Sequence, residues 1–228
     1  MEKTNPIGVV IAMESELKPY LDRANGDFTE ETFGGKTFYR LRIGGKDAVV
    51  TFSGIGKVNA AYATTLLCYR YEPTFIVSTG VSGGLGRSKV LESVVATATC
   101  QHDSDTSPLG DPVGFVSTVN KIYFETDKVL SDRFAQILNA KQGVVASGDQ
   151  FIADKSRAEK IVSLFDAVAC DMESGAIGHV CHMQNKPFVV IRCISDGADD
   201  NAGLSFSQIV DRAALTLCDA VTTALRTL

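Results

Sequence analysis

The sequence predicts a single-domain α/β protein in which a mixed β-sheet is flanked by helices on both faces. Short apolar runs of strand length alternate along the chain with longer segments of helical length, a pattern typical of α/β folds. The strand-like runs are apolar throughout, which indicates that both faces of the sheet are covered. A chain of 228 residues with 45% hydrophobic residues can bury one such core. Since no linker, internal repeat or low-complexity segment divides it, residues 1–228 are expected to form one domain.

The first half of the chain is predicted to alternate strands and helices around one hairpin. Strands are expected at residues 7–13, 37–43, 47–53 and 74–79, and helices at 15–24 and 58–71. Gly44 and Gly45 separate two of these strands and are typical of a hairpin turn. The segment Gly80-Val81-Ser82-Gly83-Gly84 is expected to end the strand before it in a turn whose backbone N–H groups can approach a ligand.

The second half continues the alternation after one irregular stretch. An extended segment at 90–100 leads into an excursion at 101–120 that is rich in Asp, Ser, Pro and Gly. Further strands are expected at 143–147, 166–169 and 187–194, and helices at 126–140, 156–165, 174–182 and 205–226.

Composition excludes several classes of function. The net charge is −5, and no basic patch interleaved with aromatic residues is present, so nucleic-acid binding is not expected. No apolar run approaches the roughly 20 residues that span a bilayer. The apolar run that begins at Ile7 is short and is followed by Glu14 and Glu16, unlike a secretory signal. The six cysteines include no CxxC pair, and a reducing cytoplasmic location is expected.

Acidic side chains follow three of the predicted strands. Glu14 and Glu16 follow the first, Asp171 and Glu173 follow the strand at 166–169, and Asp196 follows the strand at 187–194. Taken alone, each acid has a simpler explanation: an acid is favoured in the first turn of a helix, and an aspartate is favoured in an Asx turn. The two later strands are expected to be adjacent and to deliver their acids to the edge where α/β sheets bind ligands. Such a two-acid site suits cleavage of a glycosidic bond.

Glu14 and Glu16 are two residues apart at a helix start. They therefore point to different sides, and at most one of them is expected to face a site.

Other motifs point to no cofactor or metal. The turn at Gly54-Ile55-Gly56-Lys57 lacks the third glycine of a dinucleotide fingerprint, and no phosphate-loop signature occurs. His179 and His182 are three residues apart on a predicted helix, but no second cluster completes a metal site. They are expected to pack on the helix, while His102 lies in the excursion without an assigned role.

Together these segments resemble the 5′-methylthioadenosine/S-adenosylhomocysteine nucleosidases of the purine nucleoside phosphorylase superfamily. The resemblance covers nearly the whole chain in order. The matching segments include Ile11-Ala12-Met13-Glu14-Ser15-Glu16 and Ser53-Gly54-Ile55-Gly56-Lys57-Val58. The most specific are Ser147-Gly148-Asp149-Gln150-Phe151-Ile152, Asp171-Met172-Glu173 and Ile194-Ser195-Asp196. The fold implied is nucleoside phosphorylase-like, and the activity implied is hydrolysis that releases adenine from a 5′-thio-substituted adenosine, without a cofactor.

The resemblance also implies roles for individual residues. Asp196 matches the acid that protonates adenine N7, and Glu16 matches the acid that activates water. Glu173 matches the residue that binds the ribose hydroxyls, with Met172 packed on the sugar. Arg192 is expected to support these carboxylates electrostatically.

The remaining positions concern the base, the 5′ group and a second subunit. Phe151 matches the aromatic that stacks on adenine, Ile152 matches the backbone that reads the base edge, and Ser195 adjoins the acid. By family position the 5′ pocket is lined by Met13, Ile55 and Phe206, and by Thr106 and Leu109 of a neighbouring subunit, which implies a homodimer.

Two positions depart from the family pattern. Val81 stands where many relatives place a serine that reaches the site, and Leu109 stands where an aromatic is typical. Substrate preference is therefore less closely defined than reaction type.

Three alternatives stay open at this point. A nucleoside phosphorylase must hold phosphate, yet the region of the first strand carries Glu14 and Glu16, which oppose an anion. A futalosine-type hydrolase would differ only in the 5′ pocket. A nucleoside-binding module could lose its catalytic acids, whereas Glu16, Glu173 and Asp196 are all present.

Overall fold

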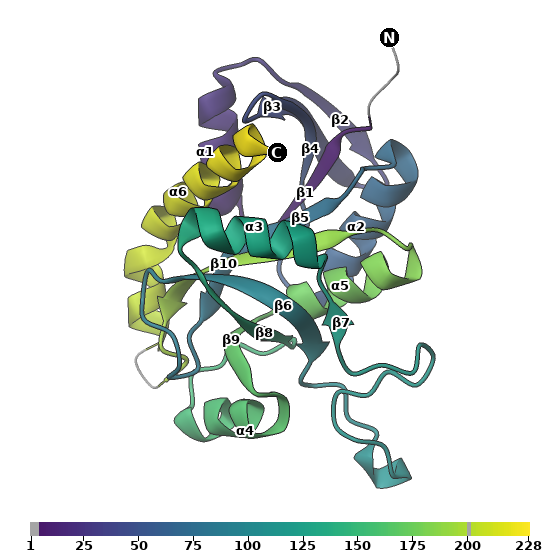
Figure 1. The fold of residues 1–228 in the computed structure, drawn as a ribbon, viewed down its shortest axis with the longest axis vertical. Coiled ribbons are helices and arrows are strands. Elements are labelled where there is room, and N and C mark those ends of the chain that lie inside the picture. Colours follow the sequence, from purple (N-terminus) through teal and green to yellow (C-terminus); the bar gives the residue numbers. More distant parts are fainter. Residues whose placement is uncertain (1–4, 200–201) are drawn as a thin grey trace.

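Ten strands form one mixed sheet in the part of the chain that the structure describes, residues 5–199 and 202–228 of a computed structural model (Figure 1). The strands are β1 (Ile7–Ile11), β2 (Thr29–Phe33), β3 (Lys36–Ile43), β4 (Lys46–Phe52), β5 (Ile76–Gly83), β6 (Ser93–Gln101), β7 (Phe124–Glu125), β8 (Lys141–Ser147), β9 (Ala167–Asp171) and β10 (Phe188–Asp196). The helices are α1 (Glu14–Ala24), α2 (Lys57–Tyr71), α3 (Lys128–Leu138), α4 (Lys155–Phe165), α5 (Ser174–Met183) and α6 (Ala202–Thr227), with a short 3₁₀ helix η1 (Ser107–Leu109).

The centre of the sheet closes on itself. The strands follow the order β10-β6-β8-β9-β5-β1-β4-β3-β2, and β10 also pairs with β5, so that five strands complete a ring. β10 runs parallel to β5 along nearly its whole length, whereas β5 and β9 meet at a single pair, Gly83 and Cys170, close to their carboxyl ends. This curvature brings the ends of separate strands to one place.

The strands that carry Asp171 and Asp196 are not adjacent, contrary to the sequence prediction. β5 lies between β9 and β10. β9 is parallel to β8 and β6, and β6 is antiparallel to β10, so β9 and β10 run in opposite directions. Consecutive strands usually neighbour each other, but here β5, which comes much earlier in the sequence, fills that position.

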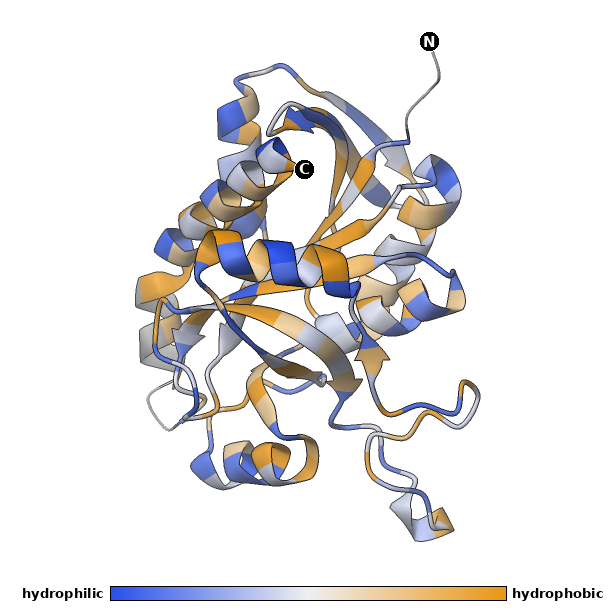
Figure 2. Ribbon diagram, viewed as in Figure 1, coloured by the Kyte–Doolittle hydropathy of each residue, from blue (hydrophilic) through white to orange (hydrophobic). Residues whose placement is uncertain are grey.

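Helices cover both faces of the sheet, as predicted. One apolar cluster joins the sheet to α1, α3 and α6, and a second joins it to α2 and α5, while α4 packs on a third cluster around β8 and β9. Figure 2 shows hydrophobic residues concentrated on the central strands, while the helices alternate hydrophobic and hydrophilic residues along their length. No helix in the described ranges has both the length and the apolar character needed to cross a membrane.

The predicted elements are found, with differences at some ends. The hairpin around Gly44 and Gly45 joins β3 and β4 in antiparallel register. Two strands were not predicted. β2 has the sequence TEETF and is mostly exposed, so it lacks an apolar pattern, and β7 has only two residues. The irregular excursion between β6 and β7 extends away from the rest of the molecule and carries η1 near its tip (Figure 1).

Candidate active site

One cavity collects the predicted site residues of a single chain. It lies where β1, β5, β9 and β10 end, and α1 begins at its edge. Its lining includes both predicted catalytic acids and all ten predicted substrate-binding residues: Glu16, Asp196, Met13, Ile55, Val81, Phe151, Ile152, Met172, Glu173, Arg192, Ser195 and Phe206. Segments far apart in the sequence therefore build a single site.

Glu16 is held by backbone N–H groups from two segments. Its Oε2 accepts hydrogen bonds from the N–H groups of Ala12 (3.2 Å) and Met13 (3.0 Å), and its Oε1 accepts one from Val81 (2.9 Å). The side chain is buried, while Glu14 is exposed, so only one of the two acids faces the cavity, as predicted. Burial raises the pKa of Glu16, although these N–H groups and the charge of Arg192 act in the opposite direction.

Gly80 makes room for Glu16. A Cβ atom on Gly80 would lie 2.8 Å from Glu16 Oε1. The glycine-rich segment does not turn where the sequence predicted, because β5 continues through Gly80 to Gly83 in register with β10. Because Gly80 has no side chain, the carboxylate of Glu16 can approach the backbone of β5 closely.

Arg192 and Asp171 form a buried ion pair in the lining of the cavity. Arg192 Nε lies 2.7 Å from Asp171 Oδ2, and Arg192 Nη2 donates to Ser78 Oγ at 2.9 Å and to Ser174 Oγ at 2.6 Å. Asp171 also accepts hydrogen bonds from the hydroxyls of Ser147 and Ser174. Burial alone would raise the pKa of Asp171, but the charge of Arg192 and these hydrogen bonds hold it below its ordinary value.

The sequence placed Asp171 among the acids at the ligand-binding edge of the sheet, or at a helix start, and did not predict its pairing with Arg192. Asp171 also fills the helix-start role, because its Oδ1 accepts from the backbone N–H groups of Glu173 and Ser174 at the start of α5. A buried charge needs a partner, so an aspartate in a strand otherwise lined with apolar residues was the available signal.

Glu173 precedes α5, but its side chain reaches the start of a different helix, α2. The N–H of Gly56 donates to Glu173 Oε1 at 2.8 Å, in the turn that begins α2. Burial, with a further contribution from the negative charge of Asp171, raises the pKa of Glu173 to about 7. The carboxyl group is therefore ready to hold or release a proton near neutral pH.

Glu173 should make the stability of the protein depend on pH. An ordinary glutamate has a pKa near 4.5, whereas folded Glu173 holds its proton up to about pH 7. The folded state binds more protons in this window, so the free energy of unfolding falls as the pH rises from 4.5 to about 7. We expect Glu173→Gln to flatten this dependence in urea unfolding measured across the window.

The control is Glu14→Gln, which removes an exposed glutamate from the same molecule. It should leave the pH dependence of the free energy of unfolding unchanged. The pH dependence that remains in Glu173→Gln belongs to other acids with raised pKa, Glu16 and Asp196. Equal slopes for Glu173→Gln and the wild type would contradict the assignment.

Asp196 is the last residue of β10 and follows an irregularity in its pairing with β5. Its Oδ2 accepts from Ser195 Oγ at 2.8 Å, and its Oδ1 accepts from the N–H of Ala198, also at 2.8 Å. The side chain is buried, and burial raises its pKa. An irregularity of this kind re-aims a side chain at the end of a strand.

Apolar side chains form another part of the lining. Phe151 and Phe206 meet edge to face with ring centroids 5.9 Å apart. Phe151 is 48% exposed, whereas Ile152 beside it is buried. An exposed aromatic face beside buried acids suits a flat, partly polar ligand.

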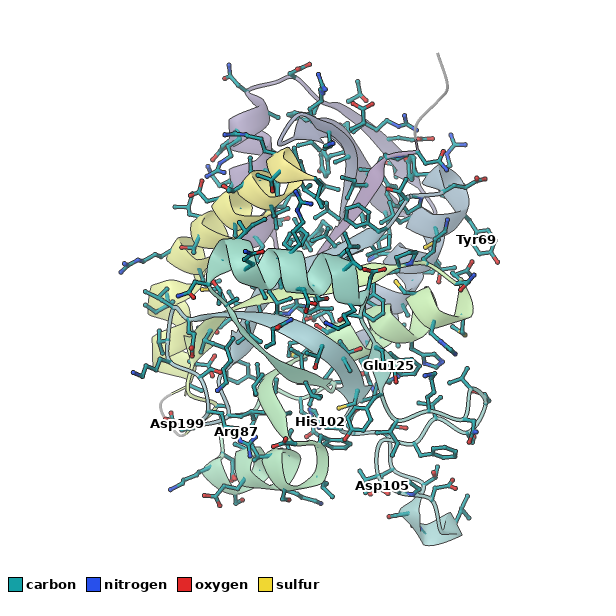
Figure 3. The ribbon with its side chains drawn as sticks, viewed as in Figure 1. Tyr69, Arg87, His102, Asp105, Glu125 and Asp199 are labelled. Atoms are coloured by element: carbon teal, nitrogen blue, oxygen red, sulfur yellow. The ribbon has the colours of Figure 1, made fainter. Side chains whose placement is uncertain are left out.

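Thr106 and Leu109 do not line this cavity in the single chain. Leu109 belongs to η1 and is 83% exposed. Figure 3 shows Asp105 on the same projecting excursion and His102 at its base.

His179 stacks on Phe124, with centroids 4.8 Å apart and an angle of 14° between the ring planes. Within residues 5–199 and 202–228, no three His, Cys, Asp or Glu side chains are grouped as a metal ion would require.

The chemistry available is acid–base chemistry in a partly apolar site. Glu16, Glu173 and Asp196 are buried carboxyl groups with raised pKa, and fixed backbone N–H groups or a hydroxyl orient them. The family model described as the phosphorylase superfamily matches residues 6–226. The chain belongs to the phosphorylase superfamily.

Individual members of the phosphorylase superfamily resemble this chain along most of their length. An aminodeoxyfutalosine nucleosidase from Helicobacter pylori is 37% identical, covering 92% of this chain and 94% of its own. A 5′-methylthioadenosine/S-adenosylhomocysteine nucleosidase from Actinobacillus succinogenes is 38% identical, and the match covers 94% of this chain and 96% of the relative. The crystal structure of the Helicobacter pylori 5′-methylthioadenosine/S-adenosylhomocysteine nucleosidase with butyl-thio-DADMe-Immucillin-A has a TM-score of 0.95, 35% identity and full coverage of both chains.

Proposed function

We propose that this member of the phosphorylase superfamily hydrolyses the N-glycosidic bond of 5′-methylthioadenosine and S-adenosylhomocysteine, releasing adenine and the thioribose product. The observation that carries the proposal is the position of the Glu16 carboxylate. At the edge of the cavity it accepts hydrogen bonds from the backbone N–H groups of Ala12, Met13 and Val81. A phosphorylase must hold an anion beside the sugar, and a buried carboxylate there opposes it. Water is the acceptor that this arrangement favours.

Asp196 acts as the general acid. Burial raises its pKa, which favours the protonated form, and transfer of that proton to adenine N7 makes the base a better leaving group. Ser195 Oγ and the N–H of Ala198 hold the two carboxyl oxygens in place.

Glu16 and Glu173 act on the sugar side. Glu16 orients and deprotonates the attacking water. Glu173 accepts hydrogen bonds from the ribose hydroxyls, which strengthen as the ring gains oxocarbenium character. Met172 packs on the sugar, and Arg192 acts through Asp171, which it pairs with directly.

The base and the 5′ group bind to the apolar lining. Phe151 stacks on adenine and the backbone of Ile152 reads its edge, while Met13, Ile55 and Phe206 surround the 5′ substituent. Val81 contributes its backbone N–H to Glu16, and any residue except proline supplies that group at this position. The departure from serine at position 81 therefore leaves the hold on Glu16 intact.

A homodimer would complete the site. Leu109 on the excursion is 83% exposed, and Val58 at the start of α2 is 80% exposed. Both side chains are available for burial against a second copy, which by family position would place Thr106 and Leu109 at its 5′ pocket. We assign the enzyme to the cytoplasm, a location supported by six cysteines that are all free and buried.

Product analysis tests the reaction type. We expect 5′-methylthioadenosine to give adenine and free thioribose, detected by chromatography, at a rate that does not change when phosphate is added. Strict dependence on phosphate with formation of a sugar 1-phosphate would instead establish a phosphorylase and remove Glu16 from its role.

A second substrate deserves the same assay, because the Helicobacter pylori relative is an aminodeoxyfutalosine nucleosidase. Leu109 in place of an aromatic offers less apolar area to a small 5′ group. Turnover of aminodeoxyfutalosine at a kcat/KM equal to or above that of 5′-methylthioadenosine would favour this function.

A further inference from the structure

Three segments of the chain meet beside the cavity and are joined by a closed ring of hydrogen bonds. Lys57 Nζ donates to Asp103 Oδ1 at 2.6 Å, the N–H of Asp149 donates to Asp103 Oδ2 at 2.8 Å, and the N–H of Lys57 donates to Asp149 Oδ1 at 2.7 Å. The residues come from the start of α2, the excursion after β6 and the loop after β8. Each residue contacts the other two.

The ring adjoins two parts of the proposed site without lining the cavity. Lys57 follows Gly56, whose N–H donates to Glu173. Asp149 lies two residues before Phe151 in a short loop. None of Lys57, Asp103 and Asp149 belongs to the cavity lining. From outside the cavity, the ring therefore connects the turn that contacts Glu173 with the loop that carries Phe151.

The start of α2 depends on this arrangement. Gly56 has no side chain with which to cap the helix, and the first turn of α2 contains no acid. The carboxylates of Glu173 and Asp149 accept from the N–H groups of Gly56 and Lys57 instead. A tertiary cap of this kind makes the start of the helix sensitive to the position of both acids.

The fit at Gly56 and Gly148 is close. Gly56 has φ of +100°, and a Cβ there would lie 3.0 Å from Asp149 Oδ1. On the other side of the loop, a Cβ on Gly148 would lie 2.4 Å from the ring of His102. Both glycines allow the loop after β8 to sit between α2 and the excursion.

The ion pair at the centre of the ring is sheltered from solvent. The side chains of Lys57 and Asp103 are 19% and 16% exposed, whereas those of Lys18 and Asp22, a comparable pair on α1, are 72% and 61% exposed. Burial alone would raise the pKa of Asp103, but its hydrogen bonds with Lys57 and Asp149 and the charge of Lys57 lower it overall. A sheltered, charge-assisted pair holds its geometry better than an exposed one.

We propose that Lys57, Asp103 and Asp149 are positioning residues, which hold the Phe151 loop and the Gly56–Glu173 contact in the geometry that binds the nucleoside. This inference rests on the proposed function. Without the ring, the Phe151 loop and the Gly56–Glu173 contact can shift independently of each other, so substrate binding weakens. Glu16 and Asp196, which perform the chemistry, stay in place.

The test compares Lys57→Met with Lys57→Arg and with the control Lys18→Met. We expect Lys57→Met to raise KM for 5′-methylthioadenosine about tenfold, as the loss of charge-assisted hydrogen bonds does, with a smaller change in kcat. Lys57→Arg should recover most of the loss, since it keeps the charge. Lys18→Met removes an exposed ion pair and should leave both constants unchanged.

Adenine binding by calorimetry gives a readout that needs no turnover. Lys57→Met should weaken it in proportion to the rise in KM. Asp149→Asn keeps the shape of the side chain and should act in the same direction, and the double variant should lose less than the product of the two single effects.

Kinetic constants within twofold of the wild type for Lys57→Met, or an equal loss in Lys18→Met, would overturn the proposal. So would a fall in the unfolding temperature of Lys57→Met with normal adenine affinity, which would assign the ring to stability alone. If the wild type neither binds adenine nor hydrolyses the nucleoside, the proposed function fails instead, and the two failures are therefore distinct.

Discussion

Replacing Asp196 with asparagine is expected to lower kcat for 5′-methylthioadenosine by about 10³-fold, within the usual range for loss of a general acid. Asparagine keeps the shape of the side chain, and its carbonyl oxygen can still accept from the N–H of Ala198. It cannot deliver a proton to the departing adenine. The fold and the affinity for substrate should therefore change much less than the rate.

A substrate with a better leaving group distinguishes a role of Asp196 as general acid from a purely structural role. A 5-thioriboside of 4-nitrophenol needs no protonation to depart, so Asp196→Asn should hydrolyse it at nearly the wild-type rate. Steady-state kinetics with both substrates provide the measurement. Near-normal turnover of 5′-methylthioadenosine, or an equal loss on both substrates, would remove Asp196 from the acid role.

Replacing Glu16 with glutamine is expected to reduce kcat by about 10²- to 10⁴-fold, because an amide cannot deprotonate water. It should also reduce stability. The carboxylate accepts from three backbone N–H groups through both oxygens, whereas an amide offers one accepting oxygen. At least one buried donor then faces an NH₂ group, which costs about 1–3 kcal/mol.

Rate and stability should be measured together for this variant, by single-turnover hydrolysis and by urea unfolding. Glu14→Gln is the matched control, since Glu14 is in the same helical turn but exposed. It should leave both quantities unchanged. A Glu16→Gln enzyme that retained a tenth or more of the wild-type kcat would show that another group activates the water.

Much of the site could be predicted from the sequence because the family motifs are local. Asp171-Met172-Glu173 and Ser195-Asp196 each lie within a few residues of a strand end, where a sheet exposes its ligands. The spacing of Glu14 and Glu16 also selected one acid for the cavity, since a helix turns about 100° per residue.

Contacts between distant segments could not be predicted in this way. The pairing of Arg192 with Asp171 and the ring through Lys57, Asp103 and Asp149 depend on which strands neighbour each other. The expected adjacency of β9 and β10 was wrong because β5 pairs with both. Gly80 illustrates the same point, since its lack of a side chain serves Glu16, which is 64 residues earlier in the sequence.

By itself, the sequence determined the α/β class, the order of all helices and of the strands other than β2 and β7, and the residue types available for acid–base chemistry. Apolar periodicity and motif spacing are properties of neighbouring residues. The tertiary structure alone decided which acids are buried, which N–H groups hold them and therefore which carboxyl groups have a raised pKa. Burial and hydrogen bonding are set by the arrangement of the sheet: its closure brings the ends of β5, β9 and β10 together, and β1, beside β5, ends at the same cavity.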